Sequence, residues 1–155
     1  MASGSYIQKL REKIGYERIL VASVAAIIHD DNQRLLLQRK AGSEGWSLPA
    51  GAIEPGETPL EALSREVLEE TGLEIEDAKL VGAFGGEAFR HKYPNGDQVE
   101  YTVLVYFCGI FNEPGEPPDP ETQELAYFEE ADMPTLALPY PKDLLFNPNT
   151  VDDPD

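Results

Sequence analysis

The sequence predicts a single-domain α/β protein. Two long runs of β-type residues, 19–29 and 99–111, lie on either side of a segment with strong helix signals at 59–71. A chain of 155 residues is of the size of one domain, and it can bury roughly 68–70% of its unfolded surface. The apolar fraction of 41% is ordinary for a globular protein.

Composition narrows the classes of partner and the compartment. The net charge of −17 argues against a nucleic-acid backbone or an anionic membrane as the main partner. Cys108 is the single cysteine, which excludes an internal disulfide and fits a reducing compartment. The first residues lack the apolar core of a signal peptide, and the apolar run at 19–28 is too short to span a bilayer. We therefore expect a cytoplasmic protein.

The chain is expected to have three parts. Residues 1–16 form an N-terminal helical extension, because Tyr6, Ile7, Leu10 and Ile14 have the spacing of a short amphipathic helix and Gly15 ends the pattern. Residues 17–146 form the main domain. Residues 147–155 are polar and contain proline, so we expect a flexible tail.

The first β-type run is followed by a turn at 30–32 and a leucine-rich segment at 34–39. Two such segments around a polar turn predict a β-hairpin. Arg39 lies at the end of the second strand. Arginine pairs well with phosphate oxygens, although a solvated cation at a strand end is an equally good interpretation. Further along, Trp46 is expected to be a buried scaffold residue.

The segment 59–71 carries its own helix boundaries. Thr58 is a good N-cap, Pro59 suits the first helical position, and Glu61 completes a capping box with Thr58. Gly72 suits the left-handed conformation that ends many helices. Helical spacing places Leu60, Leu63 and Val67 on one apolar stripe that is expected to pack on a core.

Three glutamates, Glu66, Glu69 and Glu70, project elsewhere on this helix at i,i+3 and i,i+4 spacing. Two like charges about 4 Å apart repel by roughly 4 kcal/mol at an effective dielectric constant of about 20. A cation between them would relieve the repulsion, and ligands with only oxygen donors suit Mg²⁺ or Mn²⁺. The alternative for a pair of glutamates alone is a solvated acidic helix face.

The loop before the helix favours the metal site over the solvated acidic face. Gly51 is followed after five residues by Glu57, then after seven by Arg65-Glu66-Val67, then by Glu69-Glu70 and Gly72-Leu73. This pattern resembles the complete Nudix box, with every defined position filled. The resemblance covers roughly residues 19–134. It implies the Nudix fold, in which a mixed β-sheet lies between α-helices as α/β/α layers.

The resemblance also implies a chemistry and a set of site residues. The reaction is hydrolysis of a diphosphate linkage, with Mg²⁺ or Mn²⁺ held by Glu66, Glu69, Glu70 and the Gly51 carbonyl. Arg65 and Glu57 would orient these ligands. The general base is either Glu66 or an acidic residue before the last strand, for which Glu121 fits best and Glu124 second. The expected catalytic residues are Glu66, Glu69, Glu121 and Arg65.

Downstream of the box, residues 74–87 predict a strand that Gly85-Gly86 interrupts, for which a bulge is one explanation. The segment 90–97 is cationic for so acidic a chain, and Asn95-Gly96 predicts a hairpin turn. Arg90 or Lys92 could bind phosphate, and Tyr93 or Phe89 could stack on a base. An exposed hairpin tip explains the segment slightly better. Together with Arg39, the substrate-binding candidates are Arg90 and Tyr93.

The remaining segments have simpler interpretations. Cys108 is expected to be an inert core residue, 112–120 a loop, 121–128 the last strand, and 132–145 a loop with a short helix. The expected substrate is a small-molecule nucleotide, with ADP-ribose or a nucleotide sugar favoured over a nucleoside triphosphate. A Nudix-fold sensor that binds nucleotide without hydrolysis is the rival of another class. We expect no nucleic-acid or membrane partner, and we leave a homodimer open.

Overall fold

The computed structural model describes residues 5–40, 45–111 and 122–148. Its elements follow one another as α1 (Ser5–Ile14), β1 (Ile19–Ile28), β2 (Leu35–Lys40), β3 (Ala50–Ala52), α2 (Pro59–Thr71), β4 (Ile75–Phe84), the 3₁₀ turn η1 (Glu87–Phe89), β5 (Arg90–Lys92), β6 (Gln98–Ile110), β7 (Thr122–Phe128), the 3₁₀ turn η2 (Glu130–Asp132) and α3 (Lys142–Phe146). No helix in these ranges is long and apolar enough to cross a membrane.

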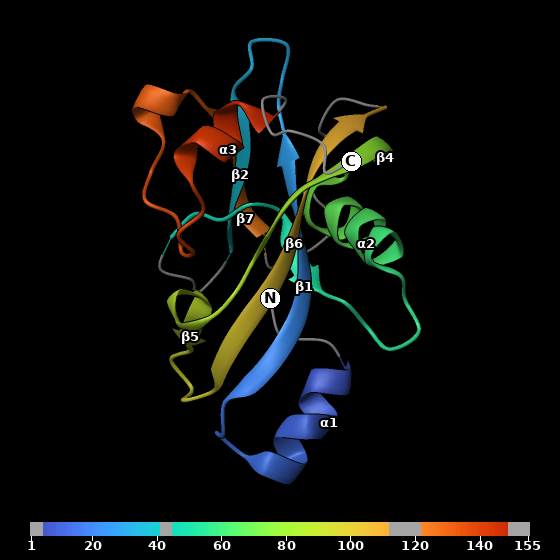
Figure 1. Cartoon of the computed structure of the whole chain (residues 1–155), viewed down its shortest axis with the longest axis vertical. Helices are drawn as coiled ribbons and strands as arrows, with labels where there is room; N and C mark the ends of the chain where they lie inside the picture. Colours follow the sequence, from blue (N-terminus) through green and yellow to red (C-terminus); the bar gives the residue numbers. More distant parts are fainter. Residues whose placement is uncertain (1–4, 41–44, 112–121, 149–155) are drawn as a thin grey trace.

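The central sheet is five-stranded and mixed, with the order β3-β1-β6-β4 and β5 paired to β6 (Figure 1). β1 and β6 run parallel over their whole length, from Ile19 opposite Val99 to Ile28 opposite Cys108. β3 pairs with β1 and β4 with β6, both antiparallel. β1 therefore lies between β6, which pairs with all of it, and β3, which pairs with residues 23–25.

That pairing overturns the predicted hairpin between the first two strands. β2 pairs with β7 in a separate two-stranded sheet. Among the described residues, a single isolated antiparallel bridge, between His29 and Leu35, closes the turn in the way a hairpin would. The local turn signal was correct, but from Leu35 to Lys40 β2 pairs with the more distant β7.

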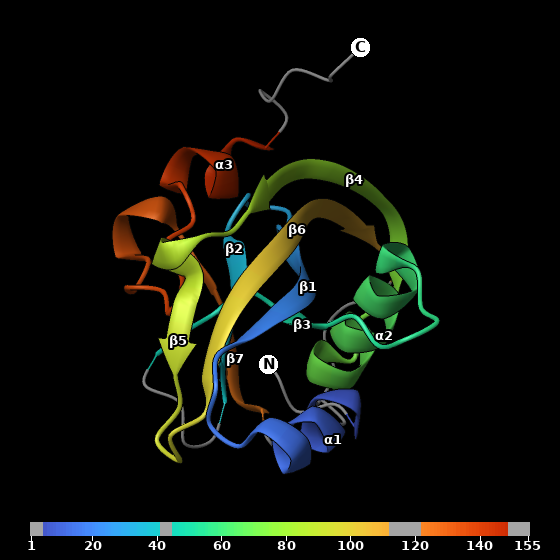
Figure 2. The same ribbon diagram turned by 60° about the horizontal axis from the view of Figure 1, so that its bottom comes forward.

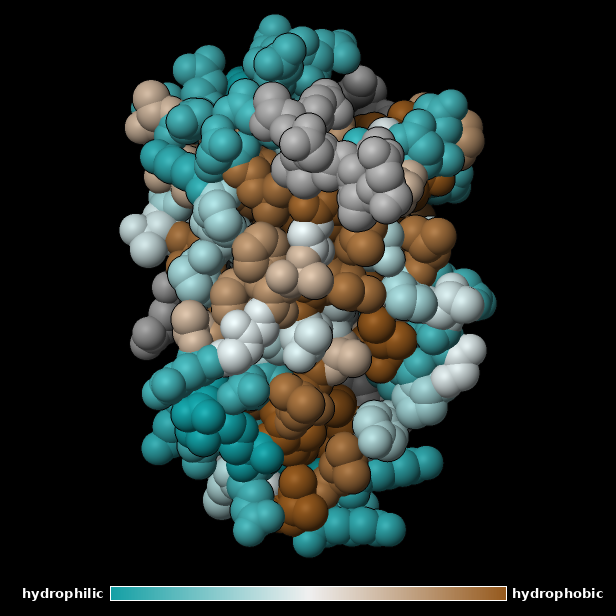
Figure 3. All heavy atoms as spheres, viewed as in Figure 1, coloured by the Kyte–Doolittle hydropathy of each residue, from teal (hydrophilic) through white to brown (hydrophobic). Residues whose placement is uncertain are grey.

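The two faces of the sheet carry separate apolar clusters, and the figures show helices on both sides (Figures 1 and 2). Along β1, Val24, Ala26 and Ile28 face α2, while Ala25 and Ile27 belong to the cluster packed by α1 and α3. A strand buried on both faces reads as a continuous apolar run, which explains the sequence of β1. On the face viewed in Figure 1, apolar residues gather along the middle of the sheet, flanked by hydrophilic residues (Figure 3).

Helix α2 has the predicted boundaries. Thr58 accepts a hydrogen bond from the Glu61 N–H, Glu61 returns the capping-box bond, and Gly72 is left-handed with φ 76°. Leu63 and Val67 are buried in the α2 cluster, as expected. Leu60 is 51% exposed, so its place on the apolar stripe was wrong. In the same turn Ala62, and not Leu60, takes the buried position.

The other local expectations were mostly confirmed. Trp46, predicted to be buried, is half-buried, and it packs edge-on against Phe128 with ring centroids 5.0 Å apart. Cys108 is buried, and burial raises the pKa of its thiol to about 12, as suits an inert core residue. The strand after the box ends at Phe84, so the interruption at Gly85-Gly86 was confirmed, but it ends the strand and is not a bulge. The register irregularities lie nearer the start and middle of β4.

Candidate active site

Glu70 projects into the protein interior and is 0% exposed, which helical spacing had not indicated. Its Oε1 accepts hydrogen bonds from the Ala50 N–H at 2.8 Å and from Gln38 Nε2 at 2.9 Å. Its Oε2 lies 2.5 Å from Lys40 Nζ. Burial raises the pKa of Glu70, and the Lys40 ammonium opposes that rise. Glu70 therefore ties α2 to β2 and β3.

Glu66 lies one turn earlier on α2, against the backbone of β3. A Cβ atom added to Gly51 would lie 2.0 Å from Glu66 Cδ, so the carboxylate fills the space that glycine leaves. Burial, followed by repulsion from Glu70, raises the pKa of Glu66 to about 7, and Arg65 opposes the shift. Gly51 and Glu66 are thus brought together as predicted.

Arg65 connects the loop before α2 to the glutamates. Its Nε donates to Glu57 Oε2 at 2.7 Å and its Nη2 to Glu57 Oε1 at 2.8 Å, a two-pronged pair. Nη2 also donates to the Ala52 carbonyl at 3.1 Å, and Nη1 to Glu66 Oε1 at 2.7 Å. The bonds to Glu57 contribute most to raising the pKa of Arg65, and they lower the pKa of Glu57. The predicted link between Arg65 and Glu57 is present.

The donor chemistry of this cluster fits Mg²⁺ or Mn²⁺, since carboxylates and the Gly51 carbonyl are hard oxygen ligands. The glutamates are nevertheless paired with protein cations: Glu70 with Lys40, and Glu66 with Arg65. Glu69 is 54% exposed, with Oε2 3.5 Å from Arg65 Nη1. Among the described residues, no three acidic, histidine or cysteine side chains are grouped closely enough to hold a metal ion. In this structure Lys40 and Arg65 therefore balance the charge of these carboxylates.

Lys40 and Gln38 are the site residues that sequence reasoning missed. Both lie on β2, and Gln38 is 1% exposed. The available signal was a glutamine inside a leucine-rich strand, since a buried amide needs a hydrogen-bonding partner. That partner, Glu70, is 32 residues away in the chain.

Arg39 lies beside this cluster and pairs with Glu124, opposite it on β7. The next pair in the β2–β7 ladder is Lys40 with Thr122. Glu121, the favoured candidate for the base, lies outside the described residues. The start of β7 is therefore near Lys40, which contacts Glu70.

The hairpin of β5 and β6 lies across the molecule from α2 (Figures 1 and 2). Arg90 Nε donates to Glu100 Oε1 at 2.7 Å, which raises the Arg90 pKa. Tyr93 is half-buried, and its hydroxyl is hydrogen-bonded to that of Tyr101. The structure does not bring Arg90 or Tyr93 to the box glutamates, and it favours the interpretation of this segment as a hairpin tip.

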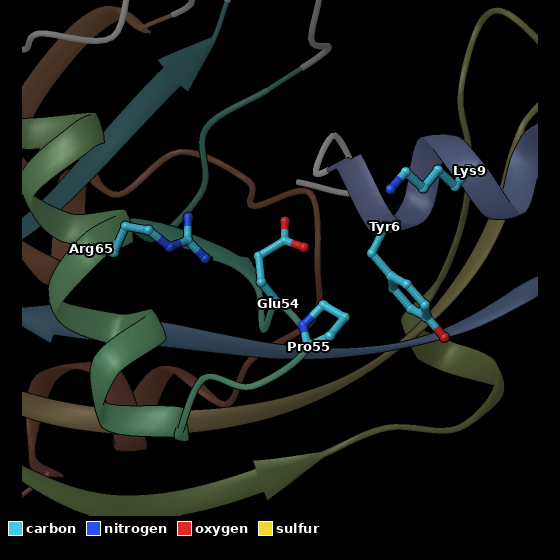
Figure 4. A pocket seen from close by; sticks show the side chains of 5 residues that line it. All are labelled: Tyr6, Lys9, Glu54, Pro55 and Arg65. Carbon is cyan, nitrogen blue, oxygen red and sulfur yellow. The ribbon is translucent and has the colours of Figure 1, made fainter.

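A cavity of about 470 Å³ borders Arg65 on the side of α1. It lies between α1 and the loop that leads into α2 (Figure 4). Its lining residues come from both elements and from α2 itself: Tyr6, Lys9, Glu54, Pro55 and Arg65.

Several known proteins are similar to this chain in sequence. A family model described as NUDIX domain matches residues 20–146. An RNA pyrophosphohydrolase of Halorhodospira halophila is 46% identical over 61 residues, 39% of this chain and 34% of that protein. The Bacillus subtilis protein YjhB, whose name assigns it provisionally to the ADP-ribose pyrophosphatases, is 31% identical over 116 residues, 75% of this chain and 53% of that protein. The chain therefore spans about a third to about half of the length of these relatives.

Among solved structures, a MutT NUDIX hydrolase from Burkholderia pseudomallei superimposes with a TM-score of 0.66 at 24% identity. The match covers 85% of this chain and 99% of that one. At this identity the likeness concerns the fold, and it confirms the predicted mixed sheet between helices.

Proposed function

The chain belongs to the NUDIX domain family, and on that premise we propose that it is a Mg²⁺- or Mn²⁺-dependent pyrophosphohydrolase. Its substrate would be a nucleoside diphosphate joined to another group. The bond cleaved would be the diphosphate linkage.

The observation that carries this proposal is the set of glutamates on α2. They pack against the Gly51 backbone and pair with Lys40 and Arg65. Glu66 fills the space over Gly51, and Glu70 is held at three points by Ala50, Gln38 and Lys40. A solvated acidic helix face would not bury Glu70 completely, because an ionised carboxylate is almost never fully buried unless paired. The burial supports a functional site over a solvated surface.

A diphosphate resists hydrolysis because its anionic oxygens repel hydroxide. A divalent cation held by Glu66, Glu69 and Glu70 would neutralise that charge and lower the pKa of a bound water. Arg65 and Glu57 would hold the loop against α2 and so orient Glu66. Glu121 remains the proposed base, supported by the pairing of the next residue, Thr122, with Lys40.

ADP-ribose and nucleotide sugars are the substrates we propose first. The relative of which this chain matches the larger share, YjhB, is provisionally named for ADP-ribose. The relative named an RNA pyrophosphohydrolase favours a 5′-phosphorylated RNA end as a second candidate. The net charge of −17 opposes that second candidate, because an RNA backbone would be repelled.

The test is a phosphate-release and product assay with Mg²⁺ over ADP-ribose, UDP-glucose, ATP and a 5′-triphosphorylated RNA. We expect turnover of the first two, and none in excess chelator. Turnover that persists with no metal present would refute the metal dependence. Binding of every nucleotide without turnover of any would instead identify a sensor.

A second measurement locates the metal. Mg²⁺ that binds only the folded state raises the melting temperature. Glu70→Gln and Glu66→Gln should each remove most of that rise, whereas Glu76→Gln, which changes an exposed glutamate on β4, should keep it. An equal rise in all three variants would move the metal away from α2.

A further inference from the structure

We infer that the cavity between α1 and the loop before α2 binds the sugar of the group joined to the nucleoside diphosphate. Glu54 and Lys9 would be its specificity-determining residues. The inference rests on the proposed function, because it extends the same substrate beyond its diphosphate. It assigns α1, which lies outside the matched residues 20–146, a role in substrate recognition.

The cavity borders the candidate active site at one side chain. Arg65 lines the cavity and donates through Nη1 to Glu66 Oε1 at 2.7 Å. Nη1 also lies 3.5 Å from Glu69 Oε2. A substrate whose diphosphate lies at these glutamates therefore has the cavity as its next neighbour on the side of α1.

The charges in the cavity fit hydroxyl groups better than a phosphate. Figure 4 shows the Glu54 carboxylate and the Lys9 ammonium pointing into the space between loop and helix. Among the described residues, neither side chain forms a hydrogen bond or an ion pair. The charge of Arg65 is already balanced by Glu57 and Glu66. A phosphate would find one free cation, Lys9, and one repelling carboxylate.

A sugar hydroxyl both donates and accepts, so it can pair with Glu54 and Lys9 at once. Carboxylates recognise ribose hydroxyls in this way in dinucleotide-binding proteins. The remaining lining residues are Pro55 and Tyr6, whose rings offer apolar contact to the C–H face of a sugar (Figure 4). Tyr6 is 46% exposed, which leaves part of its side chain accessible. The cavity volume of about 470 Å³ is within the range of small-molecule sites.

The experiment compares steady-state kinetics of the wild type, Glu54→Ala, Glu54→Gln and Lys9→Ala on ADP-ribose, UDP-glucose and ATP. Matched controls are Glu12→Ala and Lys13→Ala, which change exposed residues of α1 that do not line the cavity. A hydrogen bond to a charged group is worth about tenfold or more in affinity. We expect Glu54→Ala to raise KM for the two sugar substrates by about tenfold, with kcat changed far less, and Lys9→Ala to act in the same direction.

Glu54→Gln, which keeps an acceptor oxygen, should restore part of the loss. For ATP, Glu54→Ala should leave KM unchanged or lower it, because the variant removes a repelling charge. Equal effects on all three substrates, or no effect on the sugar substrates, would overturn the inference while the wild-type turnover still supported the proposed function.

If the wild type turned over neither sugar substrate, the proposed function would fail separately. The inference would then be decided by the rise in melting temperature that ADP-ribose causes with Mg²⁺ present. A rise that is lost in Glu54→Ala and kept in Glu12→Ala supports the cavity as a sugar site. A rise equal in both variants, or none in the wild type, refutes it.

Discussion

Replacing Gly51 with alanine tests the contact between β3 and Glu66. The new Cβ would lie 2.0 Å from Glu66 Cδ, 2.3 Å from Oε1 and 2.4 Å from Oε2, where an ordinary contact is 3.4–4 Å. The backbone itself would tolerate alanine, since Gly51 is not among the residues with positive φ. The three atoms nearest to the new Cβ all belong to the Glu66 carboxylate.

The loss of stability in Gly51→Ala depends on which atoms the new Cβ would meet. Overpacking of a core costs about 1–3 kcal/mol, and each kcal/mol lowers the melting temperature of a domain of this size by about 2–4 °C. Glu66 ends in a flexible side chain, so it can rotate away at the lower end of that cost. The rotation would break its bond to Arg65, now 2.7 Å, and remove a proposed metal ligand. Disturbing ligand orientation typically costs about 10- to 100-fold in metal affinity or activity.

The assay combines melting temperature, with and without Mg²⁺, and turnover of the best substrate. We expect Gly51→Ala to melt only a few degrees lower but to lose most of the Mg²⁺-induced rise and most of the turnover. The matched control is Gly45→Ala, whose Cβ would meet nothing closer than the Thr135 carbonyl at 3.8 Å. If Gly51→Ala bound Mg²⁺ and turned over as well as Gly45→Ala, the assignment of Glu66 to the site would be wrong.

Three further predictions concern the other groups of the site. Arg65→Ala should lower activity while circular dichroism shows an intact fold, since Arg65 orients Glu66 and Glu57 and does not itself react. The control Arg90→Ala, which changes a paired arginine on the distant hairpin, should keep activity. Global unfolding of Arg65→Ala would contradict the assigned role. Glu121→Gln should lower kcat by about 10²- to 10⁴-fold with Mg²⁺ affinity nearly unchanged, and a kcat close to that of the wild type would pass the base role to Glu124 or Glu66. Without metal, the free energy of unfolding should fall as pH rises from 4.5, the ordinary pKa of glutamate, to about 7, the pKa of folded Glu66, because the folded form holds that proton more tightly than the unfolded chain. Urea denaturation in chelator across this range measures the slope. Glu66→Gln should make the slope shallower, and the remainder is expected from Glu70, whose pKa burial also raises.

Local patterns in the sequence were enough to predict the parts of the fold whose signals lie close together. The boundaries of α2 depend on Thr58, Glu61 and Gly72, all within one helix length, and the structure shows each cap. The box itself, read from Gly51 to Leu73, indicated the family and the helix that carries the glutamates. Backbone capping and helical spacing act over a few residues, so a single sequence contains them.

The partners of these elements were decided by the tertiary structure. β1 lies beside β6, so that Ile19 pairs with Val99, while β2 pairs with β7. A period of two tells which residues share a face of a strand, but it does not tell which strand will lie alongside. The predicted hairpin failed for that reason.

The same distinction holds within the site. Spacing placed Glu66, Glu69 and Glu70 near one another, but only the packing of α2 against β2 and β3 buried Glu70 and exposed Glu69. The contact of Glu70 with Lys40 joins residues of two different elements. The cavity between α1 and the loop is likewise formed by segments that no local pattern connects. Such contacts depend on the whole chain, because burial is a property of the assembled core and not of any one segment.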